Sequence, residues 1–432
     1  MTEQHGDKTR CRRRRGAASP PGAPPTSGDI LWEIFLRLPP LPSPLLRVSL
    51  VCKRWRRLVG DPEFLHRFRA RHGKAPLLGL FSEVGGWLAF TPVVDPPDRI
   101  PPQRLSMQID TNAGTYPFQC KLLGCRHGRV LVLHPRGREV LVCDPITGDQ
   151  LRIALPPEFD TGYIRTYMTD GAVLCADRVQ GHVHGGCHAS PFKVVLVHIL
   201  HKILKGLRAT ARVYSSETGT WSNLISAPEQ CRSIIVNFHR PSTLVGGSLY
   251  WWFCSSNDDM EILEFDIVSQ TLMVIDRPPV QKLSTYRSQI IQGEDGGVGV
   301  AVLSYLSLQM WDRKVGFSGE TATWVLRKTV NLQLVPNMRA TQTEIVGYVE
   351  EEDAILMPTG RVQTDDASFT ITTGHPPMRL IMPAAALGTP LPTRSPALHR
   401  QTPTATTAVS YIVASLHHTV RPSSTKTCAP RV

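Results

Sequence analysis

Residues 29–65 have the sequence DILWEIFLRLPPLPSPLLRVSLVCKRWRRLVGDPEFL, in which start signals for short helices recur. Asp29, Ser43 and Asp61 belong to the residue types that cap helices, and proline, which the first helical turn tolerates, follows the last two. Apolar residues then recur at the spacing of one helix face, and Gly73 supplies a stop signal. Three or four short helices over residues 29–73 bury little surface, so we expect this bundle to need a partner.

The same stretch resembles the F-box, and closely the F-box of a large plant family. The segment VCKRW (residues 51–55) is the most specific part of the match, and DPEFL (residues 61–65) supports it. Such F-boxes usually open with Leu-Pro, whereas this chain has Thr-Ser-Gly at residues 26–28. The resemblance implies an F-box over residues 29–73 that binds a Skp-family subunit. The residues expected to form its core or its Skp-facing surface are Leu31, Ile34, Phe35, Leu38, Leu46, Leu50, Val51, Cys52 and Trp55.

After Gly73 the pattern changes to short apolar or alternating segments separated by Gly, Pro, Asp, Asn and Ser, which is typical of an all-β domain. Similar turns start at Asp144, Ser216 and Asp266. Ser216 and Asp266 are 50 residues apart and Asp312 follows 46 residues later (266 − 216 and 312 − 266), a spacing found in propeller blades. The segment GGSLYW (residues 246–251) resembles kelch-like blades, and residues 77–365 resemble the F-box-associated β domain of plant F-box proteins. We therefore predict a propeller-like domain over residues 77–365. Residues 198–207 are predicted to be extra sequence, a loop or helix that protrudes from the sheet.

The two ends of the chain lack core-forming patterns. Residues 1–28 combine charge, Pro and Gly with few apolar residues, and the Arg run at 12–15 fits either a nuclear import signal or a solvated basic tail. Residues 374–432 are rich in Thr, Pro and Ala and contain no acidic residue. We predict that both segments are disordered tails.

The net charge of +12 is unevenly distributed along the chain. Residues 30–74 carry ten basic and three acidic residues, whereas residues 75–366 carry 26 basic and 30 acidic residues. A large domain that grips phosphates is not normally acidic, so we expect no nucleic-acid partner. The most apolar run, residues 194–207, is interrupted by histidines and lysines and is shorter than the roughly 20 residues that cross a membrane. No membrane contact and no secretory signal are predicted, which places the protein in the cytoplasm and/or the nucleus.

Few residues offer catalytic or metal-binding chemistry. The densest set of metal ligands is His182, His184, Cys187 and His188, but neighbours so close in a glycine loop rarely converge tetrahedrally, so we expect a surface loop without metal. The acidic run at residues 350–353 is expected to be solvated. No catalytic constellation and no cofactor site are predicted. Trp252 is compatible with two positions, the core between blades or an outward anchor for a substrate.

These features predict a non-catalytic adaptor. The resemblance implies that the F-box binds a Skp-family subunit of a cullin ubiquitin ligase complex, while the β domain binds a protein substrate that the sequence does not identify. Two alternatives remain, an F-box scaffold that acts outside a ligase and a degenerate copy whose β domain binds nothing.

Overall fold

The computed structural model describes the four helices, most of the β domain and two short strands beyond it. The described residues are 28–73, 75–84, 87–109, 120–134, 138–159, 168–177, 182–187, 190–202, 206–228, 237–238, 240–254, 260–280, 283–284, 287–315, 322–332, 345, 347–357, 379–381 and 409–413. Within them, no helix is both long enough and apolar enough to cross a membrane.

Four short helices form the N-terminal bundle, α1 (Gly28–Leu36), α2 (Pro42–Val51), α3 (Lys53–Val59) and α4 (Pro62–His72). Asp61 caps α4 as predicted, because its carboxylate accepts hydrogen bonds from the backbone N–H groups of Glu63 and Phe64 at 2.8 and 3.3 Å. The other two predicted caps are wrong. Asp29 lies inside the first turn of α1, and α2 begins at Pro42, one residue before Ser43.

The β domain consists of six sheets, five with four or five strands and one with three. We number them first to sixth in chain order. The first sheet contains β1 (Leu77–Val84), β2 (Trp87–Pro92), β3 (Met107–Gln108) and β25 (Val409–Val413), and the second contains β4 (Lys121–Arg126), β5 (Arg129–His134), β6 (Glu139–Cys143) and β7 (Gln150–Ala154). The third sheet contains β8 (Thr169–Cys175), β9 (Phe192–Lys202), β10 (Gly206–Ser215), β11 (Thr220–Trp221) and β12 (Ile225–Ser226), and the fourth contains β13 (Asn237–Phe238), β14 (Thr243–Val245), β15 (Ser248–Cys254), β16 (Met260–Asp266) and β17 (Thr271–Ile275). The fifth sheet contains β18 (Ser288–Gln292), β19 (Val298–Ser304), β20 (Ser307–Lys314) and β21 (Thr323–Asn331), and the sixth contains β22 (Gly347–Val349), β23 (Ala354–Leu356) and β24 (Arg379–Ile381).

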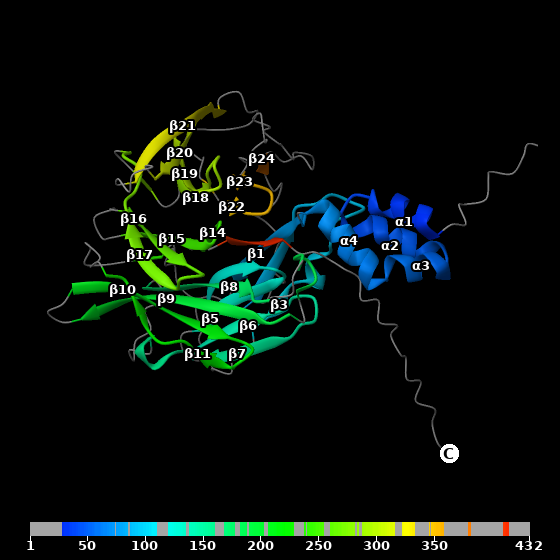
Figure 1. Ribbon diagram of the computed structural model, residues 1–432, viewed down its shortest axis with the longest axis horizontal. Coiled ribbons are helices and arrows are strands. Elements are labelled where there is room, and N and C mark those ends of the chain that lie inside the picture. Colours follow the sequence, from blue (N-terminus) through cyan, green and yellow to red (C-terminus); the bar gives the residue numbers. More distant parts are fainter. Residues whose placement is uncertain are drawn as a thin grey trace, which may run out of the picture.

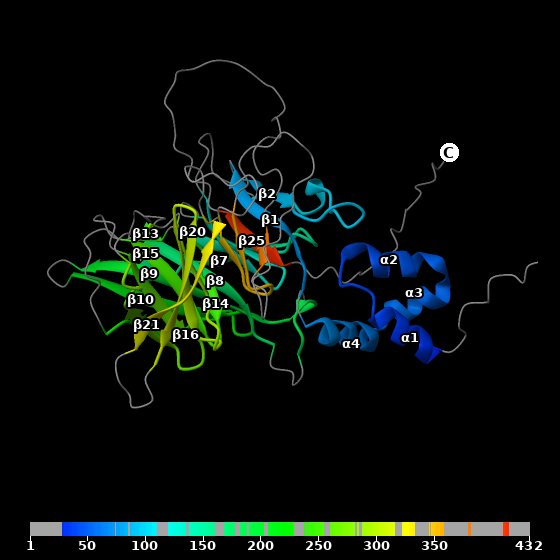
Figure 2. The ribbon, with the colours of Figure 1, turned by 90° about the horizontal axis from the view of Figure 1, so that it is seen from above.

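The six sheets close into a ring. Among the described residues, one cluster of buried apolar side chains lies between each pair of neighbouring sheets. The closing cluster joins Leu77 and Leu80 of β1 to Val349, Ala354 and Leu356 around the sixth sheet. Strands packed on both faces carry a continuous rather than an alternating apolar run, as β5 does over residues 130–133 and β19 over residues 298–303. The predicted fold, a small helical bundle followed by an all-β propeller, is therefore confirmed (Figures 1 and 2).

Two strands correct the prediction of a wholly disordered C-terminal tail. Strand β25 pairs with β1 and completes the first sheet, and β24 pairs with β23 in the sixth. The segment VSYIV at 409–413 is apolar and β-branched, a composition that suits a strand in a packed sheet. The rest of both predicted tails lies outside the described residues.

Most of the predicted protrusion at residues 198–207 belongs to strands rather than to a loop or a helix, and residues 203–205 lie outside the described residues. Strand β9 continues to Lys202 and β10 begins at Gly206, with pairing from Lys193 with Ser215 to Lys202 with Gly206. This long hairpin extends past the other strands of the domain (Figure 1).

A buried ion pair joins three sheets that are not neighbours in the ring. Arg126 at the end of β4 is 5% exposed, and its Nε and Nη2 atoms donate to the two carboxylate oxygens of Glu350 at 2.9 and 2.5 Å. The same guanidinium donates to the hydroxyl and the carbonyl of Ser242 at 2.9 and 2.7 Å, and the N–H of Leu244 donates to Glu350 at 2.6 Å. Parts of the second, fourth and sixth sheets thus meet at one point, where their inner strands approach the centre.

The acidic run at 350–353 is therefore not the solvated face that the sequence suggested. Besides Glu350, the carboxylate of Glu352 accepts a hydrogen bond from the N–H of Leu77 at 2.9 Å, which joins the sixth sheet to the first. The hydroxyl of Tyr348 donates to Asp353 at 2.6 Å, and burial raises the pKa of that hydroxyl. Glu350 and Glu352 thus join the sixth sheet to other sheets, and Asp353 is held within the turn after β22.

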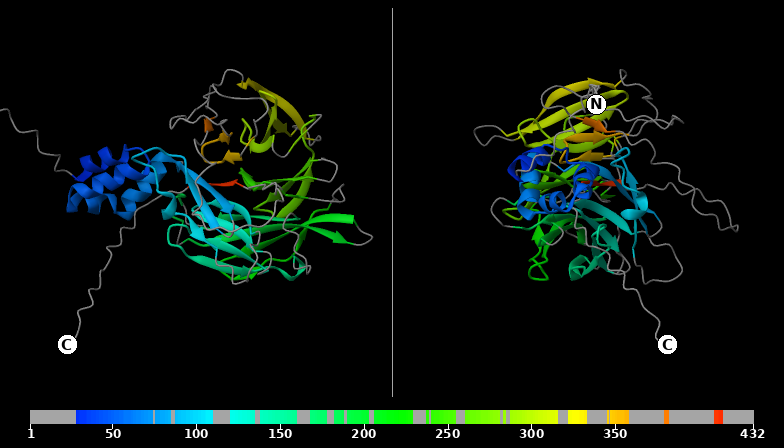
Figure 3. Two further views of the ribbon diagram at one scale, coloured as in Figure 1. Left: turned by 180° about the vertical axis from the view of Figure 1, so that it is seen from behind. Right: turned by 90° about the vertical axis from the view of Figure 1, so that its right-hand side faces the viewer.

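The helical bundle lies to one side of the ring in Figures 1 and 2 and in the left panel of Figure 3, and α4 is the helix nearest to the sheets in Figure 1. One hydrogen bond connects the helical bundle to the β domain: the N–H of Ser43 in the first turn of α2 donates to the carboxylate of Asp98 at 2.7 Å. A carboxylate at a helix N-terminus also interacts favourably with the helix dipole. The β domain thus supplies the cap that Ser43 was predicted to provide.

Lowering the pH is expected to destabilise the β domain through His198. This side chain of β9 is 4% exposed, its Nδ1 lies 2.7 Å from the hydroxyl of Thr169, and its ring stacks on Phe159. Burial lowers its pKa from 6.5 to about 4, so below pH 6.5 the unfolded chain takes up a proton that the folded chain does not. The stabilisation is complete above pH 6.5 and is lost as the pH falls through the folded value; its full size is about 3 kcal/mol.

Urea unfolding at pH 7 and pH 5 measures this effect. The His198→Gln variant should lose less stability than the wild type between the two pH values. The exposed His66 of α4 provides the control, since His66→Gln should keep the wild-type dependence. An identical pH dependence in His198→Gln and the wild type would contradict this role.

Candidate partner-binding surfaces

The helical bundle presents aliphatic side chains to solvent although its own core is complete. Ile30 and Ile34 on α1 are 52% and 44% exposed, and Leu50 and Val51 at the end of α2 are 68% and 61% exposed. We call these four residues the exposed aliphatic set. Ile30 was not among the predicted interface residues, although its position four residues before Ile34 places both on one helix face.

The nine residues predicted from the F-box resemblance divide between core and surface. Leu31 and Phe35 are buried; Leu38, Leu46 and Trp55 are half-buried; Ile34, Leu50, Val51 and Cys52 are exposed. The Trp55 ring packs edge-on against Phe35 with 5.0 Å between ring centroids, so it supports the core rather than standing free.

Helix α3 adds positive charge beside these apolar residues. Lys53, Arg54, Arg56 and Arg57 are all exposed, and Arg56 donates through Nε to the carbonyl of Ser49 at 3.1 Å. A basic surface of this kind accelerates association with an acidic partner and makes the rate sensitive to salt.

The β domain corrects the interpretation of Trp252 as a substrate anchor. Trp252 on β15 is 1% exposed and lies in the cluster between the fourth and fifth sheets. Two large aromatic side chains are exposed among the described residues, one in a hairpin turn and one at the start of a hairpin strand. Trp87 begins β2 and is 50% exposed, and Tyr305 is 74% exposed between β19 and β20. The two hairpins are equivalent, since each joins the second and third strands of its sheet.

Tyr305 has a positive φ of 53°, which a non-glycine residue adopts rarely. A turn at this tyrosine was not predicted, because residues 303–308 (LSYLSL) contain none of the Gly, Pro, Asn or Asp residues that mark turns most strongly.

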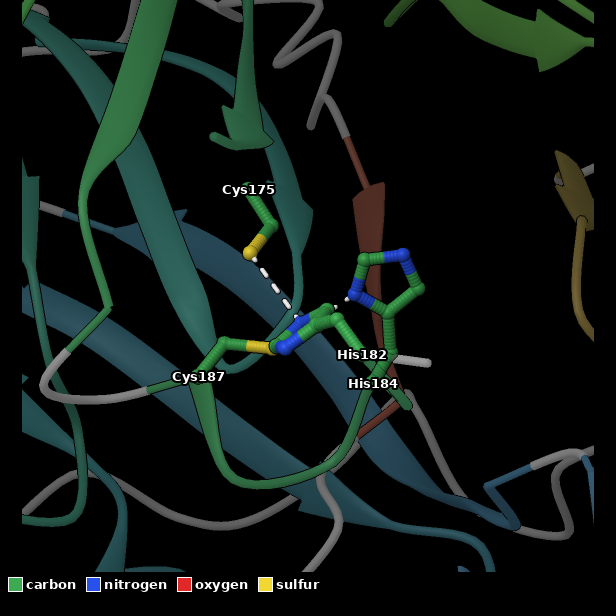
Figure 4. Close-up of side chains that lie close together, drawn as sticks. All are labelled: Cys175, His182, His184 and Cys187. Carbon is green, nitrogen blue, oxygen red and sulfur yellow. Dashed lines mark hydrogen bonds between the residues drawn. The ribbon is translucent and has the colours of Figure 1, made fainter. Parts of the chain in front are cut away.

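Four potential metal ligands come together between β8 and β9 (Figure 4). Cys175, His182, His184 and Cys187 each place a ligand atom within 4.8 Å of the other three. The expectation that ligands in this loop do not converge is therefore wrong for His182, His184 and Cys187, whereas His188 lies outside the described residues. Sequence reasoning also missed Cys175, which comes from the end of β8.

The bundle and the ring of sheets together define an F-box protein with a C-terminal β-propeller. A family model described as "F-box protein AT5G49610-like, beta-propeller" matches residues 121–366, and an F-box-like model matches residues 29–71. The propeller match spans more than half of the 432 residues, so the chain belongs to this family. Proteins with these two domains are typically non-catalytic adaptors, and F-box domains generally bind Skp-type subunits. The kelch-like character expected at residues 246–251 stays a prediction.

Individual proteins are similar to this chain only at low sequence identity and low TM-score. No match is found among the curated proteins. Among solved structures, KlHsv2 with loop 6CD replaced by a Gly-Ser linker is 10% identical, with a TM-score of 0.32 and coverage of 59% of this chain and 69% of that one. A luciferin-regenerating enzyme is 14% identical, with a TM-score of 0.29 and coverage of 60% and 78%.

Two neighbouring residues of α1, one buried and one exposed, are expected to differ strongly in their effect on the stability of the bundle. Phe35→Ala removes a buried ring and should destabilise the bundle by about 3 to 5 kcal/mol. Ile34→Ala removes an exposed side chain and should change stability by no more than about 0.5 kcal/mol. Hydrogen exchange measured on the full chain should therefore speed up across α1 to α4 only in Phe35→Ala. Equal exchange in the two variants would show that the core is assigned incorrectly.

Proposed function

We propose that this protein is the substrate-recruiting adaptor of a Skp–cullin–F-box ubiquitin ligase. The observation that carries the proposal is the exposed aliphatic set on the F-box helices. Its four side chains expose 44% to 68% of their surface although seven other apolar residues fill the bundle core. Apolar residues left in water on a small bundle favour a protein partner.

The chemistry of this function is proximity rather than bond making. A Skp-family subunit bound to the F-box joins the chain to the cullin and its ubiquitin-conjugating enzyme. The propeller holds a protein substrate, which raises the effective concentration of its lysines near the charged enzyme. The two modules fix that distance together, since α2 is hydrogen-bonded to Asp98 of the β domain.

The substrate surface is proposed to use hairpin turns rather than buried strands. Turns on a rigid scaffold commonly carry binding residues, and exposed aromatic side chains are effective anchors. Trp87 and Tyr305 meet both conditions. A second candidate function is an F-box scaffold outside a ligase, which would use the same Skp-facing side chains without a cullin.

Affinity purification with the proteasome blocked tests the proposal. Wild-type protein should bring down a Skp-type subunit and a cullin, and the Ile34→Glu, Leu50→Glu double variant should lose both, because the acidic groups cannot be buried in an apolar interface. Substrate capture should be unchanged in that variant.

Val268→Glu provides the matched control. Val268 is 89% exposed in the turn between β16 and β17, so the same change of chemistry on the other module should leave ligase assembly intact. A Skp-type subunit without cullin would favour the scaffold, and retention of both by the double variant would overturn the assigned surface.

A further inference from the structure

The loop between β8 and β9 has the features of a closed metal site. We propose that Cys175, His182, His184 and Cys187 bind one Zn²⁺ ion tetrahedrally, and that this ion fixes the loop on which helix α4 of the F-box rests. Cys175 ends β8, and the other three ligands follow within the loop before β9. The proposal is independent of the ligase function.

The spacing of the ligand atoms fits a zinc tetrahedron. His182 Nε2 lies 3.4 Å from the sulfur of Cys175 and 3.4 Å from that of Cys187, and His184 Nδ1 lies 3.5 Å from the sulfur of Cys187. Zinc bonds of about 2.3 Å to sulfur and about 2.0 Å to nitrogen, at tetrahedral angles, separate a sulfur and a nitrogen ligand by about 3.5 Å. One ion placed between the four atoms would therefore reach all of them with little movement of the loop.

The surrounding residues orient these ligands. The other ring nitrogen of His182, Nδ1, lies 3.1 Å from the carboxylate of Asp177, and Ser190 donates to that same carboxylate at 2.9 Å. A carboxylate behind a ligating histidine is the usual support for a zinc ligand. Arg129 donates to the carbonyls of Cys187 and Ser190 at 2.5 and 2.6 Å, which holds the two ends of the final turn together.

The donor atoms select the metal and the type of site. Two thiolates and two imidazoles suit zinc and not the hard cations Mg²⁺ and Ca²⁺, which prefer oxygen. Four protein ligands fill the tetrahedron and leave no position for water or substrate, so the site is structural rather than catalytic. Binding releases the two thiol protons.

The turn between the last two ligands touches the F-box. Gly185 has a φ of 119°, which favours glycine, and the next residue, Gly186, lies against the guanidinium of Arg69 on α4. A Cβ at Gly186 would stand 2.5 Å from Arg69 Nη1 and 2.8 Å from Nη2. The metal-bound turn would thus be a rigid surface that contacts α4, and it would help to fix the orientation of the F-box relative to the propeller.

Cobalt titration of the reduced, metal-stripped full chain tests the site. One Co²⁺ per chain should bind with the visible bands of tetrahedral cobalt and thiolate-to-metal charge-transfer absorption, and one equivalent of Zn²⁺ should remove both. Cys175→Ser should bind more weakly and lose part of the charge-transfer intensity, and His184→Gln provides an independent variant should the first not fold. Asp177→Asn should keep the spectrum and lose about 10- to 100-fold in affinity.

Cys52→Ser is the control for metal binding, because Cys52 is an exposed cysteine outside the cluster and its loss should leave the cobalt stoichiometry, spectrum and affinity unchanged. Absence of one-to-one binding, a Cys175→Ser spectrum equal to that of the wild type, or a Cys175–Cys187 disulfide with no cobalt uptake after reduction would each overturn the site. Hydrogen exchange should slow at residues 182–187 and in α4 when Zn²⁺ is added. Slowing in the loop alone would overturn the connection to the F-box.

Discussion

The ion pair between Arg126 and Glu350 is the interaction on which the arrangement of the propeller depends. Both charges lie deep in the domain, with side chains 5% and 18% exposed, so each would be costly to bury without the other. Arg126 and Glu350 are 224 positions apart in the chain, and their contact requires the second and sixth sheets to be in place together. Arg126 also donates a hydrogen bond to Ser242, and Glu350 accepts one from the N–H of Leu244, so the fourth sheet is connected to the same ion pair. The pair therefore favours the complete ring over partly closed arrangements.

The closed ring fixes the positions of the segments that contact the helical bundle. The loop between β8 and β9 and the segment that contains Asp98 both contact the helical bundle, so the F-box is held by parts of two different sheets or their connections. An adaptor needs such a fixed relation, because it transfers nothing itself and contributes only the distance and direction between its two partners. Exposed apolar side chains on the helices and exposed aromatic side chains on the ring are the surfaces that we propose for the two partners.

The sequence predicts the elements of this fold better than their contacts. Asp61, Pro62 and Gly73 mark α4 through local chemistry, so its ends could be placed from neighbouring residues alone. Whether Trp252 lies in the core or on the surface could not be predicted from neighbouring residues, because a strand packed on both faces has no alternating pattern that indicates where its side chains point. Likewise, the acidic run at 350–353 has the composition of a solvated turn, and only its distant partners Arg126 and Leu77 show that it is a junction. Cys175 was missed because it ends the apolar strand β8, whereas the other three ligands lie in the polar, glycine-containing loop that follows.

A double-mutant cycle on Arg126 and Glu350 tests the central claim most directly. Each single change to alanine leaves one buried charge without its partner and should cost about 3 to 5 kcal/mol, whereas the double variant should cost clearly less than the sum of the two. Urea unfolding of the full chain gives these free energies, and the exposed pair Lys314 and Asp295 supplies a reference cycle with a coupling of no more than about 1 kcal/mol. Additive effects of Arg126→Ala and Glu350→Ala, or a coupling as small as the reference, would contradict the account.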